Sequence, residues 1–378
     1  MNKQTLPENE QQSVIKGRLA SIDALRGFDM FWIIGGEAVF ASLHSIFKGP
    51  KTGFIARQLE HVKWEGFRFE ELIFPLFLFI VGTVLPFSVS RRIERGQSRR
   101  TLYLHIFKRA GVLILLGLIL SGLLRFNWPE MRWSGVLQRI GLCYFFAALL
   151  VMNTKWRTQL AVAAAILLLY WAAMTLIPVP GYGPGVITPE GCLSSYIDQN
   201  LLPGKISEQN YGYGANEGII STLPAICTTL LGALAGHWLR SKYSPNRKAA
   251  SLAAAGLICL LAGYLWGMSF PIIKNIWTSS FVLVSAGYSL LLLALFYWVI
   301  DVKGYKKWAF FFIVIGMNAI TIYYIQWIVS FDTVAAFFVD GIARCAGLAK
   351  PLVLASGALA VKWLLLLFLY RRRIFLKV

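Results

Sequence analysis

A histidine set among carboxylates and aromatic residues is the first candidate for chemistry in this sequence. His61 opens the segment His-Val-Lys-Trp-Glu-Gly at residues 61–66, and Glu70 and Glu71 follow within ten residues. An imidazole that titrates near neutral pH can take a proton from an amine or a hydroxyl nucleophile. Spacing alone leaves two interpretations of His61 open, a structural residue or a general base. Because Glu70 and Glu71 are adjacent on a predicted helix, at most one is expected to face the bundle.

Further polar residues fall inside apolar stretches, where ionisable groups are costly and are therefore functional candidates. Asp23 and Arg26 are three residues apart and share a helix face, so they either pair with each other or serve a site. Glu37 has no local cation in its stretch. We expect Glu37 to line a polar cavity, since a buried carboxylate must be protonated or paired with another helix.

Three more candidates lie later in the chain. Gln138 and Arg139 are about one turn inside the fourth apolar stretch, and Arg139 is the expected partner of Glu71 or Glu37. Asn318 belongs to a polar stripe on a later apolar segment. Such a stripe either joins helices or lines a cavity.

These side chains must be positioned by helices in a membrane. The 378 residues are 57% hydrophobic and 15% charged, which is too little charge for a soluble enzyme. The composition also excludes a secreted disulfide scaffold, a disordered chain and a fibrous repeat. We predict an all-α polytopic membrane protein, a bundle of about ten transmembrane helices. The predicted spans are residues 25–47, 69–90, 110–124, 134–152, 158–177, 219–239, 249–268, 277–300, 308–329 and 351–370.

The charge distribution predicts the topology. There are 37 Lys and Arg against 18 Asp and Glu, a net charge of +19. Placing both termini in the cytoplasm puts most cations, including the dense cluster at 91–109, on the inner side. The excess of basic residues is explained by insertion in a lipid bilayer, and it does not require a nucleic-acid partner. We expect residues 1–18 to form a polar cytoplasmic tail, residues 19–378 to form the bundle, and the outer segments 48–68 and 178–218 to cover the site.

Several common chemistries have no motif here. The sequence contains no Walker loop, metal-ligand quartet, Ser-His-Asp order or dinucleotide fingerprint, so we predict no metal site. What remains is a histidine, several carboxylates, and basic inner loops suited to a phosphorylated, activated donor.

Short motifs follow one another in a specific order over residues 18–330. They are Ser-Ile-Asp-Ala-Leu-Arg-Gly from 21, His-x-x-Trp-x-Gly at 61–66, Glu-Leu-Ile-Phe-Pro from 71, Gly-Val-Leu-Gln-Arg from 135, Glu-Gly at 217, Lys-Asn-Ile-Trp from 274 and Gly-Met-Asn from 316. In this order they resemble the transmembrane N-acetyltransferases typified by heparan-α-glucosaminide N-acetyltransferase, and especially their short bacterial relatives. The resemblance implies transfer of an acetyl group from cytosolic acetyl-CoA to the amine of a glucosamine on the far side.

The resemblance also implies roles for individual residues. It makes His61 the catalytic residue, as a general base or a carrier of the acetyl group. As our own hypotheses, Glu71 orients His61 and Glu37 is a further catalytic candidate. Substrate contacts are expected from Trp64, Asp23, Arg26, Gln138, Arg139, Glu217, Lys274, Asn275 and Asn318. Contacts with the phosphates of the donor are expected from Arg91, Arg92, Lys108 and Arg109.

Two other functions remain open at this stage. One is a transporter or flippase for a sugar or lipid-linked sugar, although no inverted repeat is visible. The other is a polysaccharide O-acyltransferase with a hydroxyl acceptor. No Asn-x-Ser/Thr sequence occurs in the chain, which favours a bacterial inner membrane over a glycosylated organelle. The expected partners are an amino-sugar or glycan acceptor and a second copy in a homodimer.

Overall fold

The computed structural model describes residues 19–206 and 212–375, and the predicted tail at 1–18 lies outside them. The described chain is helical, with two isolated β-bridges and no strand. The main helices are α2 (Ala20–Phe31), α3 (Glu37–Ile46), α4 (Pro50–Gln58), α5 (Phe69–Glu94), α6 (Arg99–Leu120), α7 (Val136–Asn153), α8 (Trp156–Leu176), α9 (Leu193–Leu201), α10 (Thr222–Leu239), α11 (Pro245–Gly267), α12 (Ser279–Phe296), α13 (Ala309–Met317), α14 (Ala319–Ile325), α15 (Phe331–Cys345) and α16 (Lys350–Arg371).

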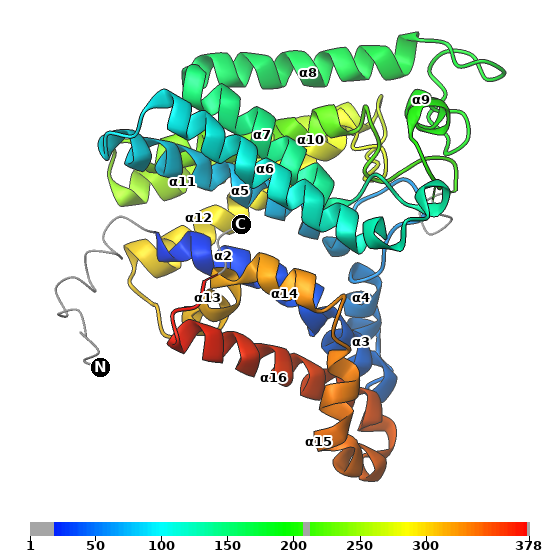
Figure 1. The fold of residues 1–378 in the computed structure, drawn as a ribbon, viewed down its shortest axis with the longest axis vertical. Helices are drawn as coiled ribbons and strands as arrows, with labels where there is room; N and C mark the ends of the chain where they lie inside the picture. The colour runs from blue at the N-terminus through cyan, green and yellow to red at the C-terminus, as the bar shows by residue number, and fades with distance from the viewer. Residues whose placement is uncertain (1–18, 207–211, 376–378) are drawn as a thin grey trace.

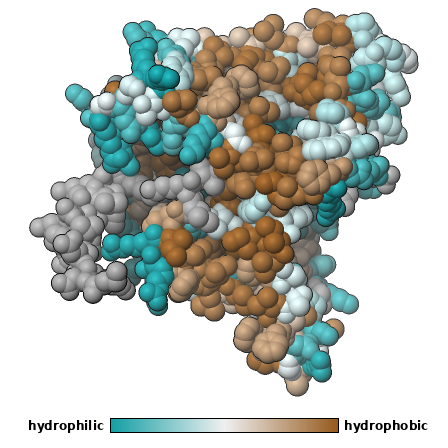
Figure 2. All heavy atoms as spheres, in the orientation of Figure 1, coloured by the Kyte–Doolittle hydropathy of each residue, from teal (hydrophilic) through white to brown (hydrophobic). Residues whose placement is uncertain are grey.

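The all-α membrane prediction is confirmed. Eight described helices are long and apolar enough to cross a membrane, namely α5, α6, α7, α8, α10, α11, α12 with its π-helical extension, and α16. They lie roughly side by side across the view, and α4 and α9 gather at one end of the bundle (Figure 1). Apolar side chains form a broad area across the middle of this face, with hydrophilic side chains toward its two ends (Figure 2).

The other two predicted spans, 25–47 and 308–329, are interrupted helices. Between α2 and α3 the chain forms a π-helical turn, Trp32–Gly36, in which Gly35 has a φ of 135° that a side chain would strain. Between α13 and α14, Asn318 leaves helical geometry at φ −127°. The total of ten spans and the cytoplasmic side of both termini therefore stay predictions.

The boundaries of one span differ from the prediction. We expected an inner loop through residue 109, but α6 already begins at Arg99. Leu102 and Ile106 are buried in its first turns, so these turns pack against the bundle and the helix starts well before the apolar stretch.

Helix α5 is the central element, and its neighbours approach it closely. A Cβ on Gly82 would lie 1.8 Å from the Thr229 carbonyl oxygen of α10, and one on Gly232 would lie 2.0 Å from the Phe79 carbonyl oxygen of α5. Glycines at these positions let two backbones touch, as in many membrane helix pairs. The contact fixes α5, which carries residues of both cavities described below.

Candidate active site

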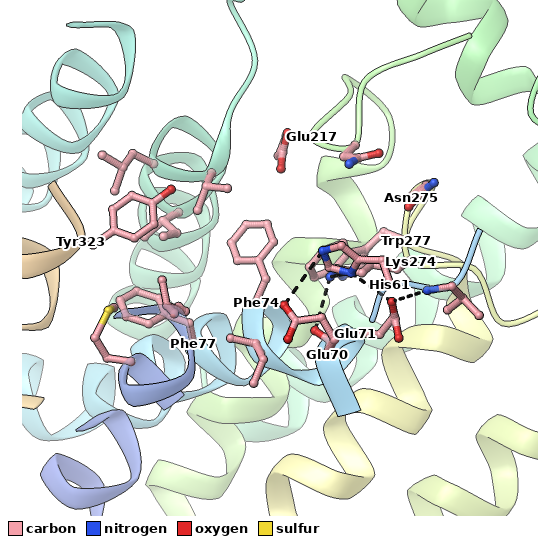
Figure 3. A pocket seen from close by; sticks show the side chains of 18 of the residues that line it. His61, Glu70, Glu71, Phe74, Phe77, Glu217, Lys274, Asn275, Trp277 and Tyr323 are labelled. Carbon is pink, nitrogen blue, oxygen red and sulfur yellow. Dashed lines mark hydrogen bonds and ion pairs between the residues drawn. The ribbon is translucent and has the colours of Figure 1, made fainter. Parts of the chain in front are cut away.

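A cavity of about 380 Å³ opens at the end of the bundle where α5 begins. Its walls come from the turn before α5, the first turns of α5 and α7, the end of the 178–218 loop and the loop before α12. We call it the active-site pocket (Figure 3). The predicted site residues that line it are His61, Trp64, Glu71, Glu217, Lys274 and Asn275.

Glu71 holds the ring of His61. One Glu71 oxygen, Oε1, lies 3.2 Å from His61 Nδ1 and accepts the Val62 N–H at 3.0 Å. The other, Oε2, accepts the Arg68 N–H at 2.9 Å. The last bond caps α5, because Arg68 is its N-cap residue and Glu71 its third helical residue. Glu71 is 1% exposed, so it is a fixed acceptor for the Nδ1 proton, and the Nε2 lone pair is left for chemistry.

Glu70 also belongs to the pocket, so the expectation that only one of the two carboxylates faces the site is wrong. Its Oε1 lies 4.0 Å from His61 Nε2. Both carboxylates reach the ring because they lie in the first turn of α5, where the preceding loop folds back over the helix end. Sequence reasoning missed Glu70 because adjacent residues point to different faces of a helix, and only one of the two was expected to face the bundle.

Lys274 supplies a cation beside these carboxylates. Its Nζ lies 3.5 Å from His61 Nδ1 and 3.5 Å from the Glu70 carbonyl oxygen. Burial lowers the pKa of the Lys274 ammonium, and the carboxylates of Glu71, Glu70 and Glu217 oppose that change. Positive charge at this position balances part of the negative charge around His61.

The two outer segments meet over the pocket. Trp64 Nε1 donates to the Ile187 carbonyl oxygen at 2.9 Å, which joins the 48–68 segment to the 178–218 loop. With its N–H satisfied, the Trp64 indole offers an apolar face to a ligand. Glu217 is ion-paired with Arg132, and Asn275 lines the wall between Lys274 and Trp277.

A buried carboxylate shapes the loop that carries Glu217. Asp198 on α9 accepts the Ile219 N–H at 2.9 Å and the Ala215 N–H at 3.2 Å. Burial raises the pKa of Asp198, although these two N–H donors act to lower it. These two hydrogen bonds fix the backbone on either side of Glu217. No local sequence pattern indicated this role for Asp198.

A second cavity, of about 310 Å³, lies at the opposite end of α5. We call it the arginine cavity, because four guanidinium groups line it, those of Arg26, Arg91, Arg92 and Arg95. The predicted pair Asp23 and Arg26 forms there, at 3.4 Å. The structure therefore brings Arg91 and Arg92 together with Asp23 and Arg26, which we had placed with the acceptor.

The other two predicted phosphate ligands lie elsewhere. Lys108 is exposed on α6, and Arg109 stacks 4.5 Å from the Tyr144 ring centroid. Neither lines the arginine cavity, because α6 continues through these positions and turns them away from α5.

Glu37 does not line the active-site pocket, contrary to expectation. It is the exposed first residue of α3, since the break at Gly35 turns the chain just before it. Its charge nevertheless interacts with those of His61 and Glu70. Glu37 is therefore a peripheral charge.

Gln138, Arg139 and Asn318 also lie outside both cavities. Arg139 is 1% exposed and donates to Ser221 Oγ at 2.5 Å, so its predicted pairing with Glu71 or Glu37 is wrong. Gln138 Nε2 lies 3.3 Å from Ser121 Oγ. Asn318 Nδ2 donates to the Ile374 carbonyl oxygen at 3.1 Å. These side chains hold helices and loops together, the role that sequence reasoning had kept as the alternative for Asn318.

Comparison with known proteins identifies the family. The family described as "Heparan-alpha-glucosaminide N-acetyltransferase, catalytic" matches residues 18–264. The chain belongs to this family. The resemblance drawn from the motifs is thereby confirmed, and the matched region contains His61, Glu71 and all four arginines of the arginine cavity.

Two curated relatives carry the name heparan-alpha-glucosaminide N-acetyltransferase. The mouse protein is 28% identical over 373 residues, which cover 84% of this chain and 54% of the relative. The human protein is 28% identical over 372 residues, with the same shares covered. The chain thus spans about half the length of the curated relatives it matches.

Proposed function

We propose that this protein is a membrane-embedded acetyltransferase that moves an acetyl group from acetyl-CoA to the amine of a glucosamine-type sugar. The observation that carries the proposal is the His61–Glu71 pair in the active-site pocket of a chain from this family. A histidine whose Nδ1 is held by a buried carboxylate is a general base with a directed Nε2 lone pair.

In the proposed reaction the acetyl group passes directly from donor to acceptor, and the Nε2 lone pair of His61 acts only as the base. The acceptor, which binds as an ammonium, first releases one proton to solvent. Its neutral nitrogen then attacks the thioester carbonyl carbon while His61 Nε2 takes a second proton from the nitrogen. A C–N bond forms, the C–S bond breaks, and the His61 imidazolium returns the proton to the leaving thiolate. Glu71 stabilises the imidazolium through Nδ1, as a buried carboxylate does in other base–orienter pairs.

Glu70 fits a role in binding the acceptor. Its carboxylate lies 4.0 Å from His61 Nε2, which leaves it close to where an acceptor ammonium must approach the base. Opposite charge attracts an ammonium more strongly than a neutral hydroxyl, so this position favours an amine over a hydroxyl acceptor. The Trp64 indole provides an apolar surface of the kind on which sugar rings pack.

The donor would occupy the other end of α5. Acetyl-CoA carries several phosphates, and the four guanidinium groups of the arginine cavity are suited to hold them. We propose that this cavity faces the cytoplasm and that the active-site pocket faces the periplasm of a bacterial inner membrane. This orientation agrees with the positive-inside distribution of the loops.

The test is acetyl transfer by the purified protein from radiolabelled acetyl-CoA to glucosamine and short amino-sugar oligomers. His61→Ala should abolish transfer, whereas His44→Ala, at a histidine bonded to Thr52 away from the pocket, should not. Label on a hydroxyl would instead indicate an O-acyltransferase. Retention of full transfer in His61→Ala would refute the assignment.

A single-turnover experiment without acceptor separates direct transfer from a two-step route. Under the proposed direct route, no label stays on the protein after a neutral quench. Label trapped on His61 would show that the imidazole carries the acetyl group itself.

A further inference from the structure

One wall of the active-site pocket carries a polar atom that the fold leaves unused. Asn216 precedes Glu217, and both residues line the pocket. Glu217 lies across the cavity from Glu70 and Glu71 (Figure 3). The Asn216 Oδ1 atom is buried and has no hydrogen-bond partner among the described residues. A buried amide oxygen without a partner is costly, so this wall suits a ligand that brings an O–H or N–H donor.

The backbone around Asn216 is held in place from behind. Asp198 accepts the N–H groups of Ala215 and Ile219, one on each side of Asn216. A Cβ on Gly218 would lie 2.0 Å from Asp198 Oδ2, so the loop packs tightly against this carboxylate. Asn216 is therefore positioned before a ligand arrives, which lowers the entropic cost of binding.

The wall continues out of the pocket through an ion pair. Glu217 pairs with Arg132, which belongs to the 121–135 loop between α6 and α7. A β-bridge between Arg132 and Gly204 joins this loop to the chain that follows α9. The Nε atom of Arg132 is buried and has no acceptor within the described part of the chain. The pocket wall and the 121–135 loop therefore form one surface, at the end of the bundle where α9 lies (Figure 1).

Two indole rings lie on this surface next to Arg132. The ring centroids of Trp128 and Trp133 are 6.2 Å apart, and the ring planes differ by 27°. Trp133 packs against Gly204, where a Cβ would lie 2.7 Å from Trp133 Cδ1. Trp128 is 45% exposed and is thus open to a ligand. An indole offers a flat apolar surface on which the C–H face of a sugar ring can pack.

We propose that the acceptor site continues along this wall and binds the end of an amino-sugar oligosaccharide. Asn216 Oδ1 accepts a hydroxyl of the sugar that carries the reacting amine, and the next sugar packs on the ring of Trp128. The Nε–H of Arg132 donates to a hydroxyl oxygen between these two points. The inference rests on the proposed function, which assigns only Glu70 and Trp64 to the acceptor.

The first test compares glucosamine with its β-linked trimer as acceptors, at saturating acetyl-CoA. The unaltered protein should have a kcat/KM about tenfold higher for the trimer. Trp128→Ala should raise KM for the trimer by about tenfold and leave KM for glucosamine within about twofold. Trp156→Ala is the matched control and should leave both acceptors unchanged, because Trp156 is 51% exposed beyond the other end of α7.

Asn216 is tested with cyclohexylamine, an amine that lacks hydroxyl groups. Asn216→Ala should lower kcat/KM for glucosamine by about tenfold and change it less than about twofold for cyclohexylamine, because only glucosamine supplies a hydroxyl to the lost oxygen. Asn216→Asp, which keeps an acceptor oxygen at this position, should recover most of that loss.

Three results would overturn the inference while leaving the acetyltransferase intact. The first is an unaltered protein with no preference for the trimer. The second is a Trp128→Ala protein that keeps this preference, as expected of a tryptophan that only anchors the chain at the membrane interface. The third is an Asn216→Ala protein with equal losses on glucosamine and cyclohexylamine, as expected of a structural residue. If the unaltered protein acetylates no acceptor, the proposed function fails and the inference with it.

Discussion

Replacing Glu71 with glutamine is the sharpest perturbation of the proposed base. The carboxylate accepts three hydrogen bonds, from His61 Nδ1, the Val62 N–H and the Arg68 N–H. Glutamine keeps one acceptor oxygen for His61 and Val62. Its amide nitrogen then faces the Arg68 N–H, and since both groups are donors, no hydrogen bond can form between them. It also removes the negative charge that stabilises an imidazolium.

The size of the effect follows from these contacts. A hydrogen bond to a charged group contributes about 1.5–3 kcal/mol. Each 1.36 kcal/mol is about tenfold in rate, so complete loss corresponds to about 10- to 150-fold. The His61 side chain is 64% exposed, and water therefore screens part of the interaction. We expect kcat to fall by about 10- to 50-fold, with a smaller change in KM for the acceptor.

The assay is steady-state acetyl transfer at saturating acetyl-CoA, with thermal unfolding in detergent as the measure of folding. Glu65→Gln is the matched control, because Glu65 is exposed on the same turn and does not line the pocket. A Glu71→Gln protein that unfolds normally and keeps kcat within about twofold would refute the view that Glu71 orients the base.

Three further outcomes are expected. Replacing Arg91 and Arg95 together with alanine should raise KM for acetyl-CoA by about tenfold or more, and added salt should shrink the difference in a titration of ionic strength. Lys362→Met removes the 2.8 Å bond from Lys362 Nζ to the Ile34 carbonyl oxygen at the break before α3, and should cost about 1–3 kcal/mol, measured by thermal unfolding. Because burial lowers the pKa of Lys274, the folded protein binds that proton less tightly than the unfolded chain, so its stability should rise with pH toward the ordinary lysine pKa of about 10. Lys274→Met should flatten that rise in unfolding temperatures recorded across pH, and an unchanged slope would contradict the burial argument.

The sequence by itself determined the helical membrane fold and the main catalytic candidate. Apolar stretches of about twenty residues have few alternatives to membrane helices, because a bilayer leaves backbone groups no partner outside the helix. His61 stood out because carboxylates and an aromatic residue lie close to it in the sequence, just before an apolar stretch. The ordered motifs led to the family, which the match over residues 18–264 confirmed.

Only the tertiary structure decided which polar residues share a cavity. Helical periodicity gives the face of a residue but not the neighbour that the face meets, so Arg139 was assigned to the wrong partner and Glu70 was left out. Likewise, the predicted topology placed Asp23, Arg26 and the arginines after residue 90 on the same inner side, but it did not indicate that they would line one cavity. Those pairings depend on how separate helices pack, and on the break at Gly35 that turns Glu37 away from the pocket.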